Sequence, residues 1–168
     1  ECSSQEMPFV LSKFPSYDAF GKASLDEIIP PEQREGAVHA AISTFSSVVL
    51  MNNGDLQFTI QELPEYCQTG PIKALAVADV NQDDILDIIY VGNHYPTEVE
   101  TARFDALVHG VCLGSRGGTF KVRALPGLRG DYRQLAAWPE EEGLRLVLAR
   151  NNRPLETCLL SEALQLVQ

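Results

Sequence analysis

Residues 73–94, KALAVADVNQDDILDIIYVGNH, contain two apolar runs separated by a short polar segment. Apolar and polar side chains alternate in KALAVAD (73–79), and this two-residue period is typical of a half-buried β-strand. A second apolar run, LDIIYVG (86–92), follows the polar segment and ends at Asn93. The stretch therefore predicts a β-hairpin in a mainly β protein.

Two further apolar runs, LVHGVCL (107–113) and TFKVRAL (119–125), follow this hairpin and complete a unit of four short strands. Part of this unit also occurs earlier in the chain, because residues 46–64 align without a gap with its second half. The aligned pairs are Val49 with Val111, Phe58 with Phe120, Leu63 with Leu125 and Pro64 with Pro126. The earlier segment is thus expected to form strands at about 45–51 and 57–63.

A third and weaker unit begins at residue 133, where residues 133–152 repeat the pattern of 73–94 with a turn two residues shorter. Repeated units of four short strands are typical of β-propeller blades. We therefore expect a mainly β fold, a partial β-propeller of about two and a half four-stranded blades. The expected boundaries are a half blade at 43–64, a complete blade at 73–126 and a degenerate blade at 133–168.

The first 42 residues have a different pattern, and we expect an N-terminal segment with short helices at 1–42. Ser16 is placed to cap the helical pattern YDAFGKA, and Ser24 with Glu27 has the spacing of a capping box. Pro31 opens PPEQREGAVHAAI at a first-turn position, which extends the expected helical structure to residue 42 and includes His39. This segment and the blades are expected to form a single domain, 1–168.

An arc of about two and a half blades leaves strand edges unpaired, because closed propellers contain at least four blades. The free backbone N–H and C=O groups of such edges favour pairing with another chain. We expect a protein partner or self-association through the open blade edges, or a longer parent chain, to complete the ring. Helices that cover an edge are the alternative.

The polar segment of the first hairpin carries oxygen-bearing side chains at alternate positions. Calcium accepts six to eight hard oxygen ligands from one tightly curled loop, and this spacing predicts a structural Ca²⁺ site. The expected ligands are the side chains of Asp79, Asn81, Asp83 and Asp87 and the backbone carbonyl near Ile85. Asp84 stands where such loops usually have glycine, and a polar turn held by its own side chains is the alternative.

The spacing D-x-N-x-D-x-x-x-D, followed by IIYVGN, resembles the FG-GAP/VCBS repeats of integrin-α-type propellers and of bacterial secreted proteins. FPSYDAFGKASLDEII, TFSSVVLMNNGDLQF, VGNHYPTEVETARFDAL and GGTF–LP are similar to the C-terminal part of bacterial VCBS-repeat proteins related to the cartilage acidic protein group. The similarity covers about Met7 to Leu155. It implies an extracytoplasmic propeller with calcium loops, whose ligands fall on Asp79, Asn81, Asp83 and Asp87, and a role in adhesion, glycan contact or scaffolding.

Residues 93–106, NHYPTEVETARFDA, interrupt the repeat, because the next unit has only NNRP at the matching position. Long loops between strands are common binding surfaces. The residues expected to contact a ligand or partner are Asn93, His94, Tyr95, Glu98, Arg103 and Asp105. The alternative is a self-satisfied loop in which Arg103 pairs with Asp105 or a glutamate.

Three functional classes fit these features. A non-enzymatic interaction or assembly module, stabilised by calcium and completed by another chain, is the main hypothesis. A carbohydrate-binding module that uses the 93–106 loop is the second. A polysaccharide-acting enzyme is the third, and it would need paired carboxylates in a cleft, for which Glu98 and Asp105 are the candidates.

Charge and composition restrict the remaining classes. The net charge of −10 argues against nucleic-acid binding, because no basic patch is available to displace phosphate counterions. No apolar run reaches the ~18 residues of a membrane helix. The expected location is extracytoplasmic, with a lipid anchor through Cys2 left open.

The chain has four cysteines, Cys2, Cys67, Cys112 and Cys158, without a C-x-x-C spacing. Structural zinc sites usually take their ligands in close pairs, so zinc is not expected. In an oxidising compartment four cysteines allow three disulfide connectivities. For Cys112, which lies on an apolar strand, we favour the interpretation as a small buried hydrophobic residue.

Overall fold

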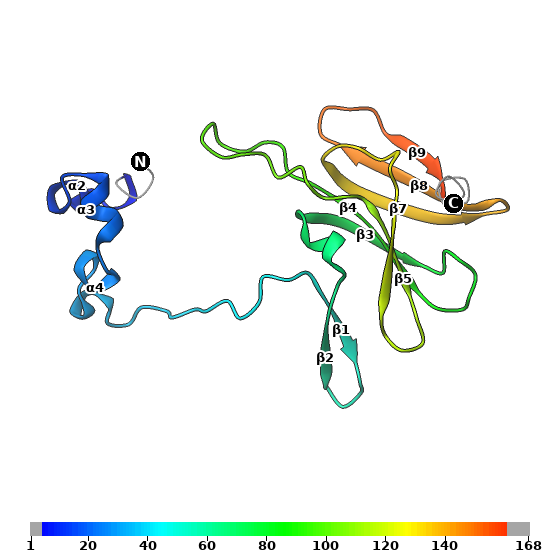
Figure 1. Cartoon of the computed structure of the whole chain (residues 1–168), viewed down its shortest axis with the longest axis horizontal. Helices are drawn as coiled ribbons and strands as arrows, with labels where there is room; N and C mark the ends of the chain where they lie inside the picture. Colours follow the sequence, from blue (N-terminus) through cyan, green and yellow to red (C-terminus); the bar gives the residue numbers. More distant parts are fainter. Residues whose placement is uncertain (1–4, 161–168) are drawn as a thin grey trace. The chain divides into compact units, whose positions relative to one another are not determined.

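The computed structural model describes residues 5–160 (Figure 1). Contacts divide the chain into two compact units, of which the first ends at Ser43 and the second begins at Thr44. Within the described residues, the first unit is made of short helices, and the second carries the strands and one further 3₁₀ helix. The lipid-anchor hypothesis concerns Cys2, which lies outside the described residues, as does the end of the segment expected to be a degenerate blade.

The first unit contains short helices whose caps follow from the sequence. They are α2 (Phe9–Lys13), α3 (Tyr17–Lys22), α4 (Leu25–Ile28) and the 3₁₀ helix η1 (Pro31–Arg34). The Ser16 side chain accepts a hydrogen bond from the backbone N–H of Ala19 and so caps α3. Both predicted features, the Ser16 cap and the capping box of Ser24 and Glu27, are confirmed.

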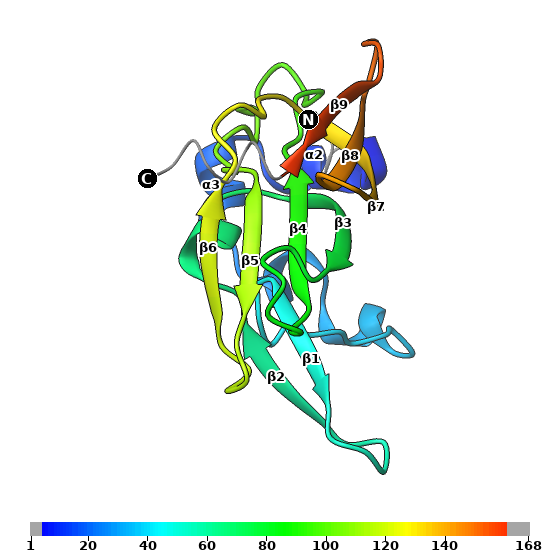
Figure 2. The same ribbon diagram turned by 90° about the vertical axis from the view of Figure 1, so that its right-hand side faces the viewer.

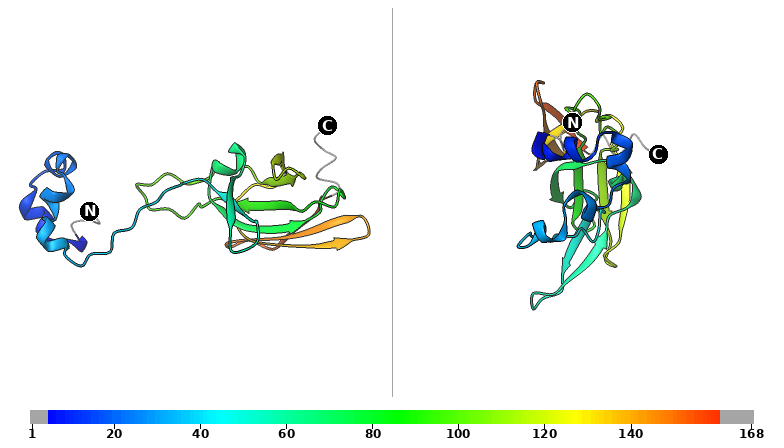
Figure 3. Two further views of the ribbon diagram at one scale, coloured as in Figure 1. Left: turned by 90° about the horizontal axis from the view of Figure 1, so that it is seen from below. Right: turned by 90° about the vertical axis from the view of Figure 1, so that its left-hand side faces the viewer.

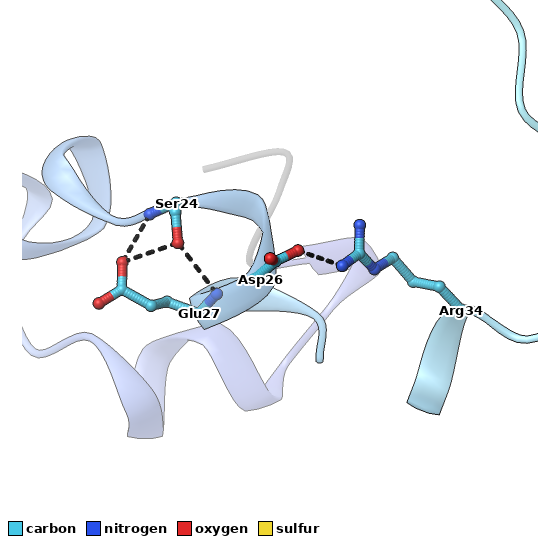
Figure 4. A network of polar contacts seen from close by, with 4 residues as sticks. All are labelled: Ser24, Asp26, Glu27 and Arg34. Carbon is cyan, nitrogen blue, oxygen red and sulfur yellow. Dashed lines mark hydrogen bonds and ion pairs between the residues drawn. The ribbon is translucent and has the colours of Figure 1, made fainter. Parts of the chain in front are cut away.

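Figure 4 shows the contacts that hold α4. Ser24 Oγ accepts a hydrogen bond from the backbone N–H of Glu27, and the Glu27 carboxylate accepts one from the backbone N–H of Ser24. These bonds lower the pKa of the Glu27 carboxyl below its ordinary value, because they stabilise the charged form. An ion pair between Asp26 and Arg34 connects α4 to η1.

Helical structure does not extend to residue 42, and the prediction that His39 lies on a helix is wrong. The chain leaves η1 at Glu35 in an extended conformation, and Gly36 follows with φ of +79°. Residues 37–45 are exposed. Short helices are marginal in water without a packed face, and the exposed side chains of GAVHAAI supply none.

The second unit is mainly β. Its described part contains β1 (Val48–Asn52), β2 (Phe58–Glu62), β3 (Ile72–Ala78), β4 (Asp87–Gly92), β5 (Gly110–Gly114), β6 (Phe120–Ala124), β7 (Tyr132–Glu140), β8 (Gly143–Arg150), β9 (Glu156–Leu159) and the 3₁₀ helix η2 (Glu65–Gln68). The strands predicted between 45 and 125 are all present, with ends that differ by three residues or fewer.

These strands form three antiparallel sheets, β1–β2, β3–β4–β5–β6 and β7–β8–β9. Neighbouring strands in each sheet are consecutive in the chain. Most are joined by short connections, whereas the connection between β4 and β5 is long and contains the 93–106 loop. Figure 2 shows the four strands of the second sheet side by side, with β4 and β5 in its centre. This sheet corresponds to the predicted complete unit, and β1–β2 corresponds to the predicted half unit.

The two faces of the four-stranded sheet pack in different clusters. Ile89 and Val91 of β4 pack with Leu146 and Leu148 of β8, so the β7–β9 sheet covers one face (Figure 3, left). The opposite face contributes Tyr90 and Cys112, among others, which pack with residues that follow β2. The sheets are therefore stacked face to face, and no sheet closes on itself within residues 5–160.

Candidate functional site: the acidic loop and the 93–106 loop

The acidic loop connects β3 to β4 and is held by its own polar groups. Asp79 Oδ1 accepts a hydrogen bond from the backbone N–H of Asp83 at 3.1 Å, and Asp79 Oδ2 accepts one from Asp84 at 2.9 Å. Gln82 and Asp84 adopt left-handed backbone conformations, with φ of 62° and 63°. Asp84 thus takes the conformation for which glycine is usual, and aspartate tolerates it better than most residues.

The remaining predicted ligands lie in the same loop. Asp83 Oδ1 accepts a hydrogen bond from the backbone N–H of Ile85 at 2.9 Å, and Asp83 Oδ2 accepts one from the side-chain amide of Asn81 at 3.0 Å. An ionised carboxylate offers about four lone-pair sites, so Asp79 and Asp83 keep acceptor capacity after these bonds.

Asp87 is the one fully buried carboxylate of this set, with a relative exposure of 0%. Its Oδ2 accepts a hydrogen bond from the backbone N–H of Val80 at 2.9 Å, and its Oδ1 accepts one from Gly114 at 2.8 Å. Gly114 ends β5. The Asp87 side chain therefore ties the acidic loop to the neighbouring strand.

The loop concentrates negative charge. None of the ion pairs found in residues 5–160 involves Asp79, Asp83, Asp84 or Asp87. In the same range, no group of three or more His, Cys, Asp or Glu side chains is gathered closely enough to hold a metal ion. A cation at this loop would therefore require the side chains of Asp79 and Asp83 to turn towards a common centre.

The 93–106 loop begins at a residue that supports the fold. Asn93 is buried, with φ of 79°, and its Oδ1 accepts a hydrogen bond from the backbone N–H of Leu107 at 2.9 Å. Its Nδ2 donates to the carbonyls of Leu107 and Gly130 at 3.3 and 3.2 Å. These bonds close the base of the loop and fix it to the segment before β7.

The rest of the loop contacts itself. His94 and Phe104 form an isolated antiparallel β-bridge. The guanidinium of Arg103 lies over the Tyr95 ring, 4.8 Å from its centroid, and pairs with Asp105 at 3.5 Å. Tyr95 and Asp105 were predicted to contact a ligand, and in the structure both side chains contact Arg103.

A cavity of about 400 Å³ lies beside this loop. Its lining includes Asn93, Tyr95, Asp105, His109 and Arg129. His94, Glu98 and Arg103 are not among its lining residues. The predicted loop residues are therefore divided between a cavity wall and the outer part of the loop.

His109 is a buried residue of this region that the sequence pattern did not distinguish. Its Nδ1 accepts a hydrogen bond from the backbone N–H of Gly92 at 3.3 Å, and its Nε2–H donates to the carbonyl of Gly130 at 3.1 Å. Burial lowers the pKa of His109, and the bond to Gly130 opposes this shift. The neutral ring thus fastens β4 to the segment that precedes β7.

Comparison of the chain with known protein families, with curated proteins and with solved structures finds no match in any of the three. The resemblance to FG-GAP/VCBS repeats therefore rests on the quoted motifs alone. In the described part of the chain, no helix is both long and apolar enough to cross a membrane.

Proposed function

We propose that this chain is a non-enzymatic, extracytoplasmic interaction module of FG-GAP/VCBS propeller type, which completes a propeller or complex with another chain and is stabilised by structural calcium. The observation that carries the proposal is the incomplete β1–β2 sheet and the apolar surface exposed beside it. The geometry of the strands gives this surface two parts.

The first part is the outer face of the hairpin. Leu50 and Ile60 are directly paired and lie on the same face, with exposures of 58% and 63%. Val49 occupies the other face, because neighbouring side chains of a strand alternate, and it packs against the four-stranded sheet. An isolated two-stranded hairpin is marginally stable in water, so its apolar outer face favours a further layer.

The second part is the uncovered end of the four-stranded sheet. Leu75 and Val77 of β3 are 59% and 52% exposed. They pair with Tyr90 and Ile88, so their side chains lie on the face of the four-stranded sheet that packs against the β1–β2 hairpin. The hairpin covers this face only in part. Two further strands added to the free edge of β1 would extend the hairpin over Leu75 and Val77. The partner we propose supplies these strands, through backbone pairing and alternating apolar side chains.

Calcium belongs to this proposal as a structural ion. Asp79, Asn81, Asp83 and Asp87, with the carbonyl near Ile85, would hold it in the acidic loop. The ion would neutralise clustered carboxylates that have no ion pair within the described residues. The left-handed conformation of Asp84 supports the proposal, since it meets the backbone requirement of the motif without glycine.

Multi-angle light scattering of the purified chain, with calcium and with chelator, tests both the proposed assembly and the proposed role of calcium. We expect self-association, or a requirement for an added partner to remain soluble, and a change when calcium is removed. Ile60→Lys places a charge on the exposed face and should reduce the association. Gln57→Lys, in the turn of the same hairpin, is the matched control. A monodisperse monomer that is insensitive to chelator would contradict the proposal.

Carbohydrate binding is the second candidate, favoured by the cavity beside the 93–106 loop. Tyr95 offers an aromatic ring and Asp105 a carboxylate at its wall, both suited to sugar hydroxyls and ring faces. Titration calorimetry with acidic and neutral oligosaccharides tests this, with Tyr95→Ala as the variant and Tyr66→Ala as control. Among the described residues, Asp105 is the one carboxylate that lines this cavity, whereas glycoside cleavage uses a pair of carboxylates.

A further inference from the structure

Two cysteine side chains meet in the core on the hairpin side of the four-stranded sheet. Cys67 lies on η2 and Cys112 on β5, and both have a relative exposure of 0%. Their sulfur atoms are 3.2 Å apart. They pack in one apolar cluster with Leu63, Tyr90 and Leu107. Two cysteines separated by 44 residues of chain are thus brought into direct sulfur contact by the fold.

We propose that Cys67 and Cys112 form a disulfide that fastens η2, and with it the β1–β2 hairpin, to the four-stranded sheet. The sulfurs need to approach by only about 1 Å to reach a disulfide bond length of about 2.05 Å. Cys158 packs in the other cluster, on the β7–β9 side, so it is not a competing partner in the folded chain. The proposal depends neither on calcium nor on assembly.

The reactivity of the pair follows from its surroundings. The pKa of Cys67 is lowered, chiefly because the Cys112 thiol donates a hydrogen bond to its thiolate, and burial opposes this shift. The same bond and burial raise the pKa of Cys112. Since the thiolate is the nucleophile in disulfide exchange, Cys67 is the better nucleophile of the pair once the two thiols are in contact.

The oxidant is a low-molecular-weight disulfide such as oxidised glutathione. The Cys67 thiolate attacks one of its sulfurs, the S–S bond breaks, and one glutathione thiolate leaves. The Cys112 thiolate then attacks Cys67 Sγ in this mixed disulfide and expels the second glutathione thiolate. The two protein thiols lose two electrons and two protons, and two reduced glutathione molecules are formed. Both sulfurs are buried in the folded chain, so the exchange takes place during folding, before the cluster closes, and the same exchange begun by Cys112 gives the same bond.

The first experiment is a disulfide map. The chain is refolded from denaturant in a mixture of oxidised and reduced glutathione, free thiols are alkylated, and the protein is digested with trypsin without reduction. We expect a linked pair of the peptides 35–73 and 104–116, which contain Cys67 and Cys112, with Cys158 alkylated. Recovery of both cysteines as alkylated thiols, or linkage of either one to Cys2 or Cys158, overturns the proposal.

The second experiment measures what the bridge does for the fold. Thermal unfolding is followed with and without reductant for the refolded chain, for Cys158→Ala and for the double variant Cys67→Ala/Cys112→Ala. We expect reductant to lower the midpoint of the first two by the same amount and to leave that of the double variant unchanged. An equal shift in the double variant would refute the proposed bridge.

Discussion

Replacement of Asp87 offers a sharp test of how the acidic loop is held to the sheet. Its carboxylate is fully buried and accepts hydrogen bonds from the backbone N–H groups of Val80 and Gly114. Asp87→Ala leaves both of these partly buried donors without this partner, at a cost of up to about 1–3 kcal/mol each. The free energy of unfolding should fall by up to about 2–6 kcal/mol, a large part of the about 5–15 kcal/mol typical of a domain. Asp87→Asn keeps one acceptor oxygen and should lose about half as much.

The assay is urea unfolding in the presence of chelator, so that only the hydrogen bonds contribute. Unfolding is followed by circular dichroism of the strands, because Trp138, the single tryptophan of the chain, is 46% exposed on β7. Asp84→Asn is the matched control, because Asn tolerates the left-handed backbone and should change stability by no more than about 0.5 kcal/mol. Equal midpoints for Asp87→Ala and Asp84→Asn would refute the reasoning.

Three further outcomes are expected. Gly92→Ala should lower the free energy of unfolding by about 3 kcal/mol in urea, because the added Cβ would lie 2.0 Å from the carbonyl oxygen of Pro71; Gly117→Ala, with its nearest neighbour at 3.9 Å, should be nearly neutral. The pKa of His109 is lowered by burial, so the folded chain binds fewer protons than the unfolded chain below pH about 6.5. The free energy of unfolding, measured in urea, should therefore fall from pH 7 to pH 5.5, by at most about 1.4 kcal/mol per pH unit. The same slope in His109→Gln would contradict this. Calcium at about 100 times its dissociation constant should add about 2.7 kcal/mol in thermal unfolding, and Asp83→Ala should abolish this gain.

The strands of the second unit were predictable because their signal is local. Apolar and polar side chains alternate in KALAVAD, and Gly, Asn and Asp residues separate the apolar runs. These features indicate where strands begin and end, and they do not depend on distant contacts. The internal repeat also predicted that residues 46–64 and 109–126 would form equivalent hairpins, which are β1–β2 and β5–β6. Closure into a propeller depends on how many sheets are arranged around a common axis, and it remains a prediction.

The errors and omissions have a physical cause in tertiary contacts. The run GAVHAAI has helix-favouring residues, but a helix there would have no apolar surface to pack on, and Gly36 breaks the chain direction. Ligand contact by Asn93 remains a prediction, and the sequence did not indicate the three hydrogen bonds with which this residue holds the loop base. The sequence allowed three cysteine connectivities, and only the packing of η2 on β5 brings Cys67 to Cys112.

The attachment of the β1–β2 hairpin explains why a covalent bond would matter at this position. The hairpin contributes few buried side chains, and its outer face is exposed. Its base is held by Gln68, whose side chain accepts a hydrogen bond from the backbone N–H of Ser47 at 2.7 Å and donates to the carbonyls of Ser47 and Leu63 at 3.0 and 2.9 Å. Cys67, its neighbour on η2, contacts the sheet. One turn of 3₁₀ helix therefore contacts the sheet through Cys67 and holds the hairpin through Gln68.

A disulfide would strengthen this attachment. By the chain-entropy relation, closing the loop between Cys67 and Cys112 would stabilise the fold by about 4 kcal/mol. This would compensate for the few side chains that the hairpin itself buries. A hairpin fixed in this way keeps the edge of β1 in position for a partner strand, whereas a reduced one depends on Gln68 and a few apolar contacts.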